Sequence, residues 1–246
     1  MENKKGFYFR LSQTEWRYLF LLISLLFLFT ILPFARERVF GINLIDFLFL
    51  AIILSGVYIA SENNKILIIA LMFALIGFAA NVLTYFLENP SFLLISICFY
   101  MLFFVLIAIE ILYHIIKSKE VTTDIIFGAI CVYLLIGVIW GLLFIFIEVI
   151  HPGSFLAEQI ITKATKHEFI HLSNYRYFIY YSFVTLTTLG YGDITPLAGP
   201  ARSLSALEAV TGQLYIAILI ARLVGLHISH SIKKESKQLK DEDKRP

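Results

Sequence analysis

The stretch Thr187-Thr188-Leu189-Gly190-Tyr191-Gly192-Asp193 decides how the rest of the chain is interpreted. It follows an aromatic segment and precedes a long apolar one. Two glycines, Gly190 and Gly192, alternate with bulky residues, and glycine adopts left-handed backbone angles without the penalty that a Cβ atom imposes. An ordinary strand points successive carbonyls in opposite directions, whereas left-handed angles at alternate positions turn them to one side. We therefore predict a row of backbone carbonyl oxygens that face a common direction.

This stretch resembles the selectivity filter of the tetrameric potassium channels, with a leucine in place of the usual valine. The resemblance implies that backbone carbonyls and the first threonine hydroxyl replace the hydration shell of K+. The acid that follows would lie at the outer mouth, where four copies attract cations. The resemblance implies that the residues of the ion-binding filter are Thr188, Leu189, Gly190, Tyr191 and Gly192. Of these, the residues that hold K+ directly are Thr188, Leu189, Gly190 and Tyr191. The residues implied to support the filter are Asp193, Tyr180, Tyr181 and Thr187.

The composition predicts a membrane protein, because 59% of the 246 residues are hydrophobic and only 15% are charged. Cys98 and Cys131 lie inside apolar runs, which indicates buried side chains, not a disulfide. The apolar run nearest the amino terminus follows several basic residues, as in a signal peptide, but it is too long to be one. A transmembrane helix needs roughly 20 apolar residues. Six runs meet this length, at about Tyr18–Ala35, Ile42–Ala60, Ile66–Leu87, Phe92–Ile116, Ile125–Ile150 and Leu204–Ile232.

The distribution of basic residues orients these spans. With a cytoplasmic amino terminus, thirteen Lys and Arg residues fall on the inner side and six on the outer side. Both termini are then cytoplasmic and the filter faces outward. Similarity to compact prokaryotic channels implies the cell (plasma or inner) membrane. The expected class is an all-α membrane protein with six transmembrane helices, a re-entrant pore helix and a filter loop.

The chain divides into three parts. Residues 1–120 hold four helices, residues 121–232 resemble the pore domain of potassium channels, and residues 233–246 form a short charged cytoplasmic tail. A single filter supplies a quarter of a pore, which predicts a homotetramer. The pore helix is expected over 174–188. The resemblance sets Tyr180 and Tyr181 where relatives often carry tryptophans, with Tyr181 placed to bond Asp193.

The last apolar run is expected to line the pore. The resemblance sets Gly212 at the gating-hinge position, although a glycine in a membrane helix also permits close packing, and both alternatives remain open. The expected pore-facing residues, where aliphatic rings could gate by dewetting, are Gln213, Ile216, Ile220 and Val224. The resemblance implies that Glu208 faces away from the axis, and we expect it to bond a pore-helix hydroxyl such as that of Thr185 or Thr187; the alternative is attraction of cations at the cavity wall.

Between Ser91 and Ile116 there is no Lys or Arg; the ionisable residues are Glu110 and His114. One charge moved through 100 mV is worth about 2.3 kcal/mol, so this helix cannot act as an arginine voltage sensor. The first four helices then form either a scaffold or a sensor of lipid, tension or a small ligand. In the outer loop, His167 and His171 could bind zinc or sense pH, but a solvated loop is favoured.

We therefore expect a potassium-selective channel that conducts passively and is not voltage-gated. The alternatives are a non-selective cation channel and a receptor or assembly subunit with a vestigial pore. No enzyme motif is present, so we expect no enzymatic activity and no cofactor, with K+ as the permeant ion. The expected partners are further copies of the chain, membrane lipid and an unknown gating ligand or regulatory protein, with no nucleic acid.

Overall fold

The computed structural model describes residues 17–31, 38–39, 42–61, 63–87, 89–118, 121–157 and 173–242. This part of the chain is mostly helical, and its strands form two short antiparallel pairs, β1 with β2 and β3 with β4. The elements follow in the order α2 (Arg17–Ile31), β1 (Arg38–Val39), β2 (Ile42–Asn43), α3 (Leu44–Ala60), α4 (Asn64–Leu87), α5 (Pro90–Lys117), α6 (Thr123–Ile150), β3 (Phe155–Ala157), α8 (Ser173–Leu186), β4 (Ile194–Pro196) and α9 (Gly199–Glu242).

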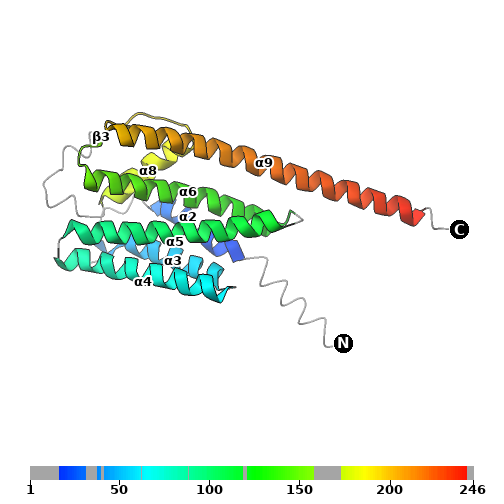
Figure 1. Ribbon diagram of the computed structural model, residues 1–246, viewed down its shortest axis with the longest axis horizontal. Coiled ribbons are helices and arrows are strands. Elements are labelled where there is room, and N and C mark those ends of the chain that lie inside the picture. The colour runs from blue at the N-terminus through cyan, green and yellow to red at the C-terminus, as the bar shows by residue number, and fades with distance from the viewer. Residues whose placement is uncertain are drawn as a thin grey trace.

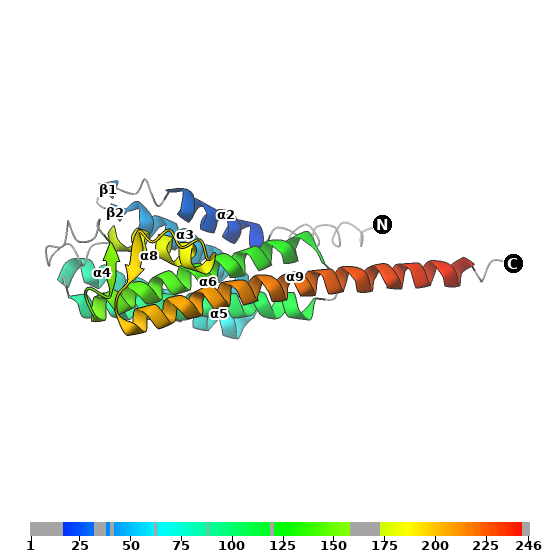
Figure 2. The same ribbon diagram turned by 90° about the horizontal axis from the view of Figure 1, so that it is seen from above.

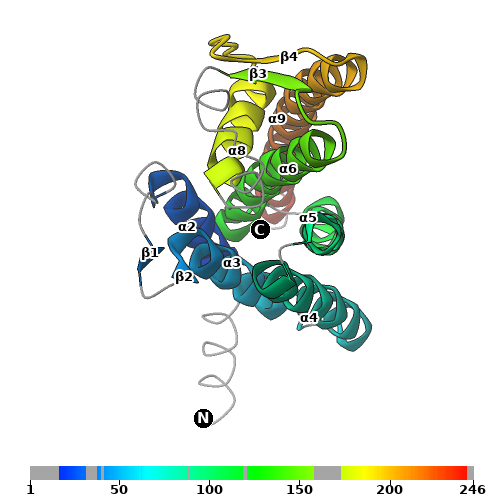
Figure 3. The same cartoon turned by 90° about the vertical axis from the view of Figure 1, so that its left-hand side faces the viewer.

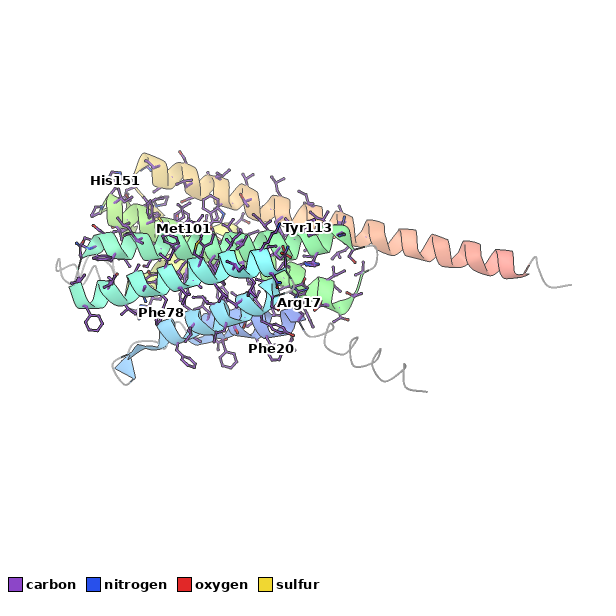
Figure 4. The ribbon with its side chains drawn as sticks, turned by 60° about the horizontal axis from the view of Figure 1, so that its bottom comes forward. Arg17, Phe20, Phe78, Met101, Tyr113 and His151 are labelled. Atoms are coloured by element: carbon purple, nitrogen blue, oxygen red, sulfur yellow. The ribbon has the colours of Figure 1, made fainter. Side chains whose placement is uncertain are left out.

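Within the described residues, four helices are long and apolar enough to cross a membrane. They supply the segments Asn64–Thr84, Pro90–Lys117, Thr123–Ile150 and Gly199–Gly225. Two further apolar segments, Arg17–Thr30 and Phe47–Ala60, are shorter. Apolar side chains such as Phe20 and Phe78 point outward from the bundle, 60% and 50% exposed (Figure 4). An apolar exterior suits a lipid environment, so the structure supports a multi-pass, all-α membrane protein.

Polar residues mark where the long helices begin. The Asn89 side chain accepts a hydrogen bond from the amide of Ser91 (2.9 Å), and Pro90 occupies the first turn of α5. The Thr122 hydroxyl accepts from the amide of Ile125 (3.3 Å) at the start of α6. Both caps satisfy amides that have no partner within the helix.

The helices from α2 to α6 run alternately in opposite directions along one bundle, and α8 and α9 both start at the same end of it (Figure 1). The Arg17 guanidinium donates to the carbonyl of Ile59, and the Tyr18 amide donates to Asp124 Oδ1 (3.4 Å). The start of α2, the end of α3 and the start of α6 therefore meet at one end of the bundle, which we call the Arg17 end. Strands β3 and β4 lie at the opposite end, which we call the filter end; His151 also lies there (Figure 4).

Helix α6 lies between the first four helices and the α8–α9 pair (Figure 3). One hydrophobic core runs through all of them and contains Leu25, Phe104, Phe144 and Phe178. Helix α2 also reaches α8 directly, since the rings of Phe29 and Phe183 meet edge to face at 4.2 Å. Helices α2 and α5 thus pack against α6, and α2 also packs against α8 of the same chain.

Helix α9 continues well beyond the rest of the bundle (Figure 2). It runs without a break to Glu242, past the expected boundary at residue 232. The added segment consists mainly of Lys, Glu, Gln and Leu, which favour helix, and it contains no glycine or proline that would stop one. The charged tail is therefore helical as far as it is described.

Candidate ion-conducting site

Helix α8 is too short to cross a membrane. It leads into residues 187–193, which we call the filter stretch after the resemblance. The 14 residues of α8 extend about 21 Å at 1.5 Å per residue, against a hydrocarbon core of about 30 Å. The helix ends at Leu186, two residues before the expected end, because the next amides fold back. The Thr188 amide donates to the carbonyl of Thr185 (2.9 Å), and the Leu189 amide donates to that of Val184 (2.9 Å). These bonds satisfy the last carbonyls of α8 and turn the chain sharply.

The filter stretch has left-handed backbone at alternate residues. The φ angles are +59° at Thr188, +60° at Gly190 and +79° at Gly192. The left-handed backbone predicted for the two glycines is confirmed. Thr188 was not anticipated, because a β-branched residue at positive φ is a genuine outlier. Strain of this kind concentrates at functional sites.

The carbonyl oxygens of Thr188, Leu189, Gly190 and Tyr191 accept no hydrogen bond from any residue that the structure describes. The single chain also leaves this stretch open, with Leu189 55% and Tyr191 66% exposed. Because these residues are exposed, water can satisfy their carbonyls in the single chain. These oxygens are therefore available as ligands for a cation.

Two adjacent tyrosines support the stretch in different ways. The Tyr180 hydroxyl is hydrogen bonded to the Asp193 carboxylate. A tyrosine hydroxyl keeps its proton at neutral pH, so Tyr180 donates and the Asp193 carboxylate accepts. The expected bond between Tyr181 and Asp193 is wrong, because the Tyr181 hydroxyl lies 2.6 Å from Ser205 Oγ on α9. Successive residues of a helix point about 100° apart, so only one of the two tyrosines can face the acid.

Strands β3 and β4 anchor the chain where it leaves the filter stretch. The pair is tied to the end of α6 by Glu148, whose Oε1 accepts from the amide of Gly153 (2.8 Å) and whose Oε2 accepts from that of Phe155 (3.2 Å). The Leu197 amide then donates to the carbonyl of Ser154 (2.8 Å). The sequence analysis missed Glu148, although a carboxylate at the end of an apolar run and before a Pro-Gly turn was a visible signal.

Helix α9 approaches α8 at Gly212. A Cβ atom placed there would lie 2.2 Å from the carbonyl oxygen of Leu186. This distance supports the close-packing alternative for Gly212. One helical turn earlier, Glu208 is fully buried and lies in hydrogen-bond contact with Ser182 Oγ. The expected bond between Glu208 and a pore-helix hydroxyl is therefore confirmed, but the hydroxyl is that of Ser182. The Thr187 hydroxyl, one of the two named as examples, donates to the carbonyl of Phe183 (2.6 Å).

The four expected pore-facing residues of α9 share one exposed stripe. Gln213 Nε2 lies 3.4 Å from Thr188 Oγ1, which sets this stripe on the same side as the filter stretch. The other members, Ile216, Ile220 and Val224, are 37%, 55% and 51% exposed. The opposite face is engaged, because the Tyr215 hydroxyl donates to the carbonyl of Ala129 on α6 (2.7 Å). Three partly buried residues of α9 that pack against the core, Tyr215, Leu219 and Leu223, are not members of this stripe.

Arg222 binds the end of α5, a contact that the sequence did not reveal. Its Nη2 donates to the carbonyls of Ile115 (2.8 Å) and Ser118 (3.2 Å). Glu110, which lies on the same helix, pairs with His114 (3.2 Å). A guanidinium at a helix carboxyl end satisfies carbonyls that have no partner within the helix.

The proposed zinc ligands His167 and His171 lie outside the described residues. Among the residues that are described, no group of three His, Cys, Asp or Glu side chains could hold a metal ion.

Residues 129–227 match a family model described as "Ion channel". The match covers less than half of the chain, but it includes α8, the filter stretch and the part of α9 that carries the exposed stripe. No curated protein and no solved structure matches the chain. The family match, together with the candidate membrane spans, supports an ion channel embedded in a membrane.

Proposed function

We propose that the protein is a potassium-selective channel that conducts K+ passively down its gradient. The observation that carries this proposal is the left-handed backbone at Thr188, Gly190 and Gly192, together with the four carbonyls from Thr188 to Tyr191, which accept no hydrogen bond from the described chain. Carbonyls turned to one side by such alternation replace the hydration shell of a K+ ion. Repulsion between ions in successive sites then allows them to leave.

A homotetramer completes the pore. One chain offers carbonyls from one direction only, whereas an ion on an axis needs oxygens all around it. The large exposed surfaces of Leu189 and Tyr191 suit contacts between neighbouring filters. In this arrangement α8 is a re-entrant pore helix, and its negative carboxyl end favours a cation beside Thr188.

Six membrane crossings complete the topology, with α2 and α3 as the two shorter spans. The Arg17 end then faces the cytoplasm, together with both termini, and the filter end faces outward across the cell membrane. Helix α5 contains no arginine, so opening is not driven by an arginine voltage sensor. Membrane lipid surrounds the bundle, and a ligand or regulatory protein supplies the gating signal.

Ion flux from the purified protein in liposomes tests this function. A K+ gradient should drive flux that barium blocks, while a Na+ gradient of equal size should drive little. Equal flux of both ions would establish the non-selective alternative. Absence of flux, also in Gly212 variants designed to favour opening, would favour a receptor or assembly subunit with a vestigial pore.

A further inference from the structure

Glu208 lies at a junction of three helices behind the filter stretch. Its side chain on α9 is fully buried, and its Oε1 contacts Ser182 Oγ on α8. The same Ser182 oxygen lies 2.7 Å from the carbonyl oxygen of Gly137 on α6. The second carboxyl oxygen of Glu208, Oε2, is buried and has no hydrogen-bond partner among the described residues.

The number of protons at this junction constrains the state of Glu208. Ser182 has one hydroxyl proton and two neighbouring oxygens, and the carbonyl of Gly137 can only accept. If Glu208 is a neutral acid, it donates to Ser182 and Ser182 donates to Gly137, so both contacts are hydrogen bonds. If Glu208 is ionised, the single hydroxyl proton of Ser182 must serve both the Gly137 carbonyl and Glu208 Oε1. The charged carboxylate also keeps Oε2 without a donor.

Among the residues that the structure describes, no nearby cation compensates a negative charge on Glu208. The titratable side chains whose charges act on Glu208 are Tyr181 from α8 and Tyr133 from α6, and neither is a cation. Tyr181 commits its proton to Ser205, because Ser205 Oγ itself donates to the carbonyl of Ala201 (2.8 Å). Glu208 forms no ion pair within the described part of the chain. A buried carboxylate without a cation or enough donors is strongly unfavourable.

The junction also holds the end of α8 that leads into the filter stretch. Ser182 lies one turn before Leu186, and Leu186 is where α9 comes into backbone contact at Gly212. Glu208 and Gly212 are themselves one turn apart on α9. The two helices therefore touch at successive turns, and a shift at Ser182 moves the carbonyls to which the filter amides are bonded.

We propose that Glu208 keeps its proton at neutral pH and acts, through Ser182, as a positioning residue for the filter. The second half of this statement rests on the proposed channel function, whereas the first half does not. Ionisation of Glu208 at alkaline pH would withdraw the donor from Ser182 and loosen α8 against α6.

Infrared spectroscopy of the full-length protein in vesicles tests the proton without any flux measurement. The carbonyl band of a protonated carboxylic acid should be present at neutral pH and should disappear in Glu208→Gln. Glu110→Gln, which removes a carboxyl that is paired with a histidine, should leave that band in place. A parent spectrum with no such band at neutral pH, or a band that survives in Glu208→Gln, overturns the assignment.

Flux measurements test the positioning role. Glu208→Gln keeps a donor for Ser182, so its flux should stay within about threefold of the parent, and Glu208→Ala should lose at least about tenfold. Parental flux should fall at alkaline pH, whereas the flux of Glu208→Gln, which cannot ionise, should stay flat there. Ser182→Ala should reproduce the loss if Glu208→Ala does not assemble.

The positioning role is overturned if Glu208→Ala and Ser182→Ala both conduct as well as the parent protein. It is also overturned if the flux of Glu208→Gln falls at alkaline pH as the parent's does. If no variant and no parent conducts while the infrared band behaves as expected, the proton assignment stands and the channel function is what fails.

Discussion

The backbone of α9 at Gly212 is in contact with the carbonyl of Leu186, the last residue of α8, because a Cβ atom on Gly212 would lie only 2.2 Å from that oxygen. The helix that carries the exposed stripe is thereby joined directly to the helix that leads into the filter. A side chain at this position must push the two helices apart.

Gly212→Ala should destabilise the assembly, because forcing an extra methyl group into a packed site costs about 1–3 kcal/mol. We expect a lower thermal midpoint for the oligomer in detergent. Gly225→Ala is the matched control, since it lies on the same helix and its added Cβ meets nothing within 4 Å. Equal midpoints for the two variants would contradict the contact.

Gly190→Ala should abolish K+ flux and leave the oligomer intact. A Cβ atom added at Gly190 meets nothing within 4 Å in the single chain. The expected loss of flux therefore comes from the backbone, which has a φ of +60° at this residue. An L side chain in this conformation costs roughly 1–2 kcal/mol, which turns the carbonyl away from the common side. Liposome flux is the measurement, and Gly199→Ala, which is equally open but not left-handed, is the control. Normal selective flux in Gly190→Ala would sink the carbonyl mechanism.

Tyr180→Phe and Asp193→Asn should be coupled, because they remove the two halves of one hydrogen bond. A double-mutant cycle on the stability of the oligomer should give a coupling free energy of about 1 kcal/mol. The same cycle with Tyr181→Phe should be additive, since Tyr181 bonds Ser205. Coupling to Tyr181 in place of Tyr180 would restore the arrangement expected from the resemblance.

Arg222→Gln should weaken the attachment of α9 to α5 by about 1–3 kcal/mol, because it leaves carbonyls at the end of α5 without their charged donor. Thermal unfolding reports the loss. Lys117→Gln removes an exposed positive charge from the same region and should change stability little. A similar effect from both substitutions would mean that general charge, not the bonds of Arg222, stabilises this end.

Much of the fold could be predicted from local sequence. Long apolar runs specify membrane helices because the bilayer requires internally satisfied backbone, and the predicted runs coincide with helices to within a few residues at most ends. The left-handed angles at Gly190 and Gly192 were predictable because glycine alone lacks the Cβ penalty. Potassium selectivity, the tetramer and the six crossings remain predictions.

Contacts between distant segments were decided only by the tertiary structure. Ser182 as the partner of Glu208, Tyr180 as the partner of Asp193, and Arg222 at the end of α5 depend on how helices are rotated about their axes. Residue type shows that a buried polar group needs a partner, but several candidates lie within one turn. The packing of α6, α8 and α9 selects among them, because the rotation of each helix decides which polar atoms come within bonding distance inside the bundle.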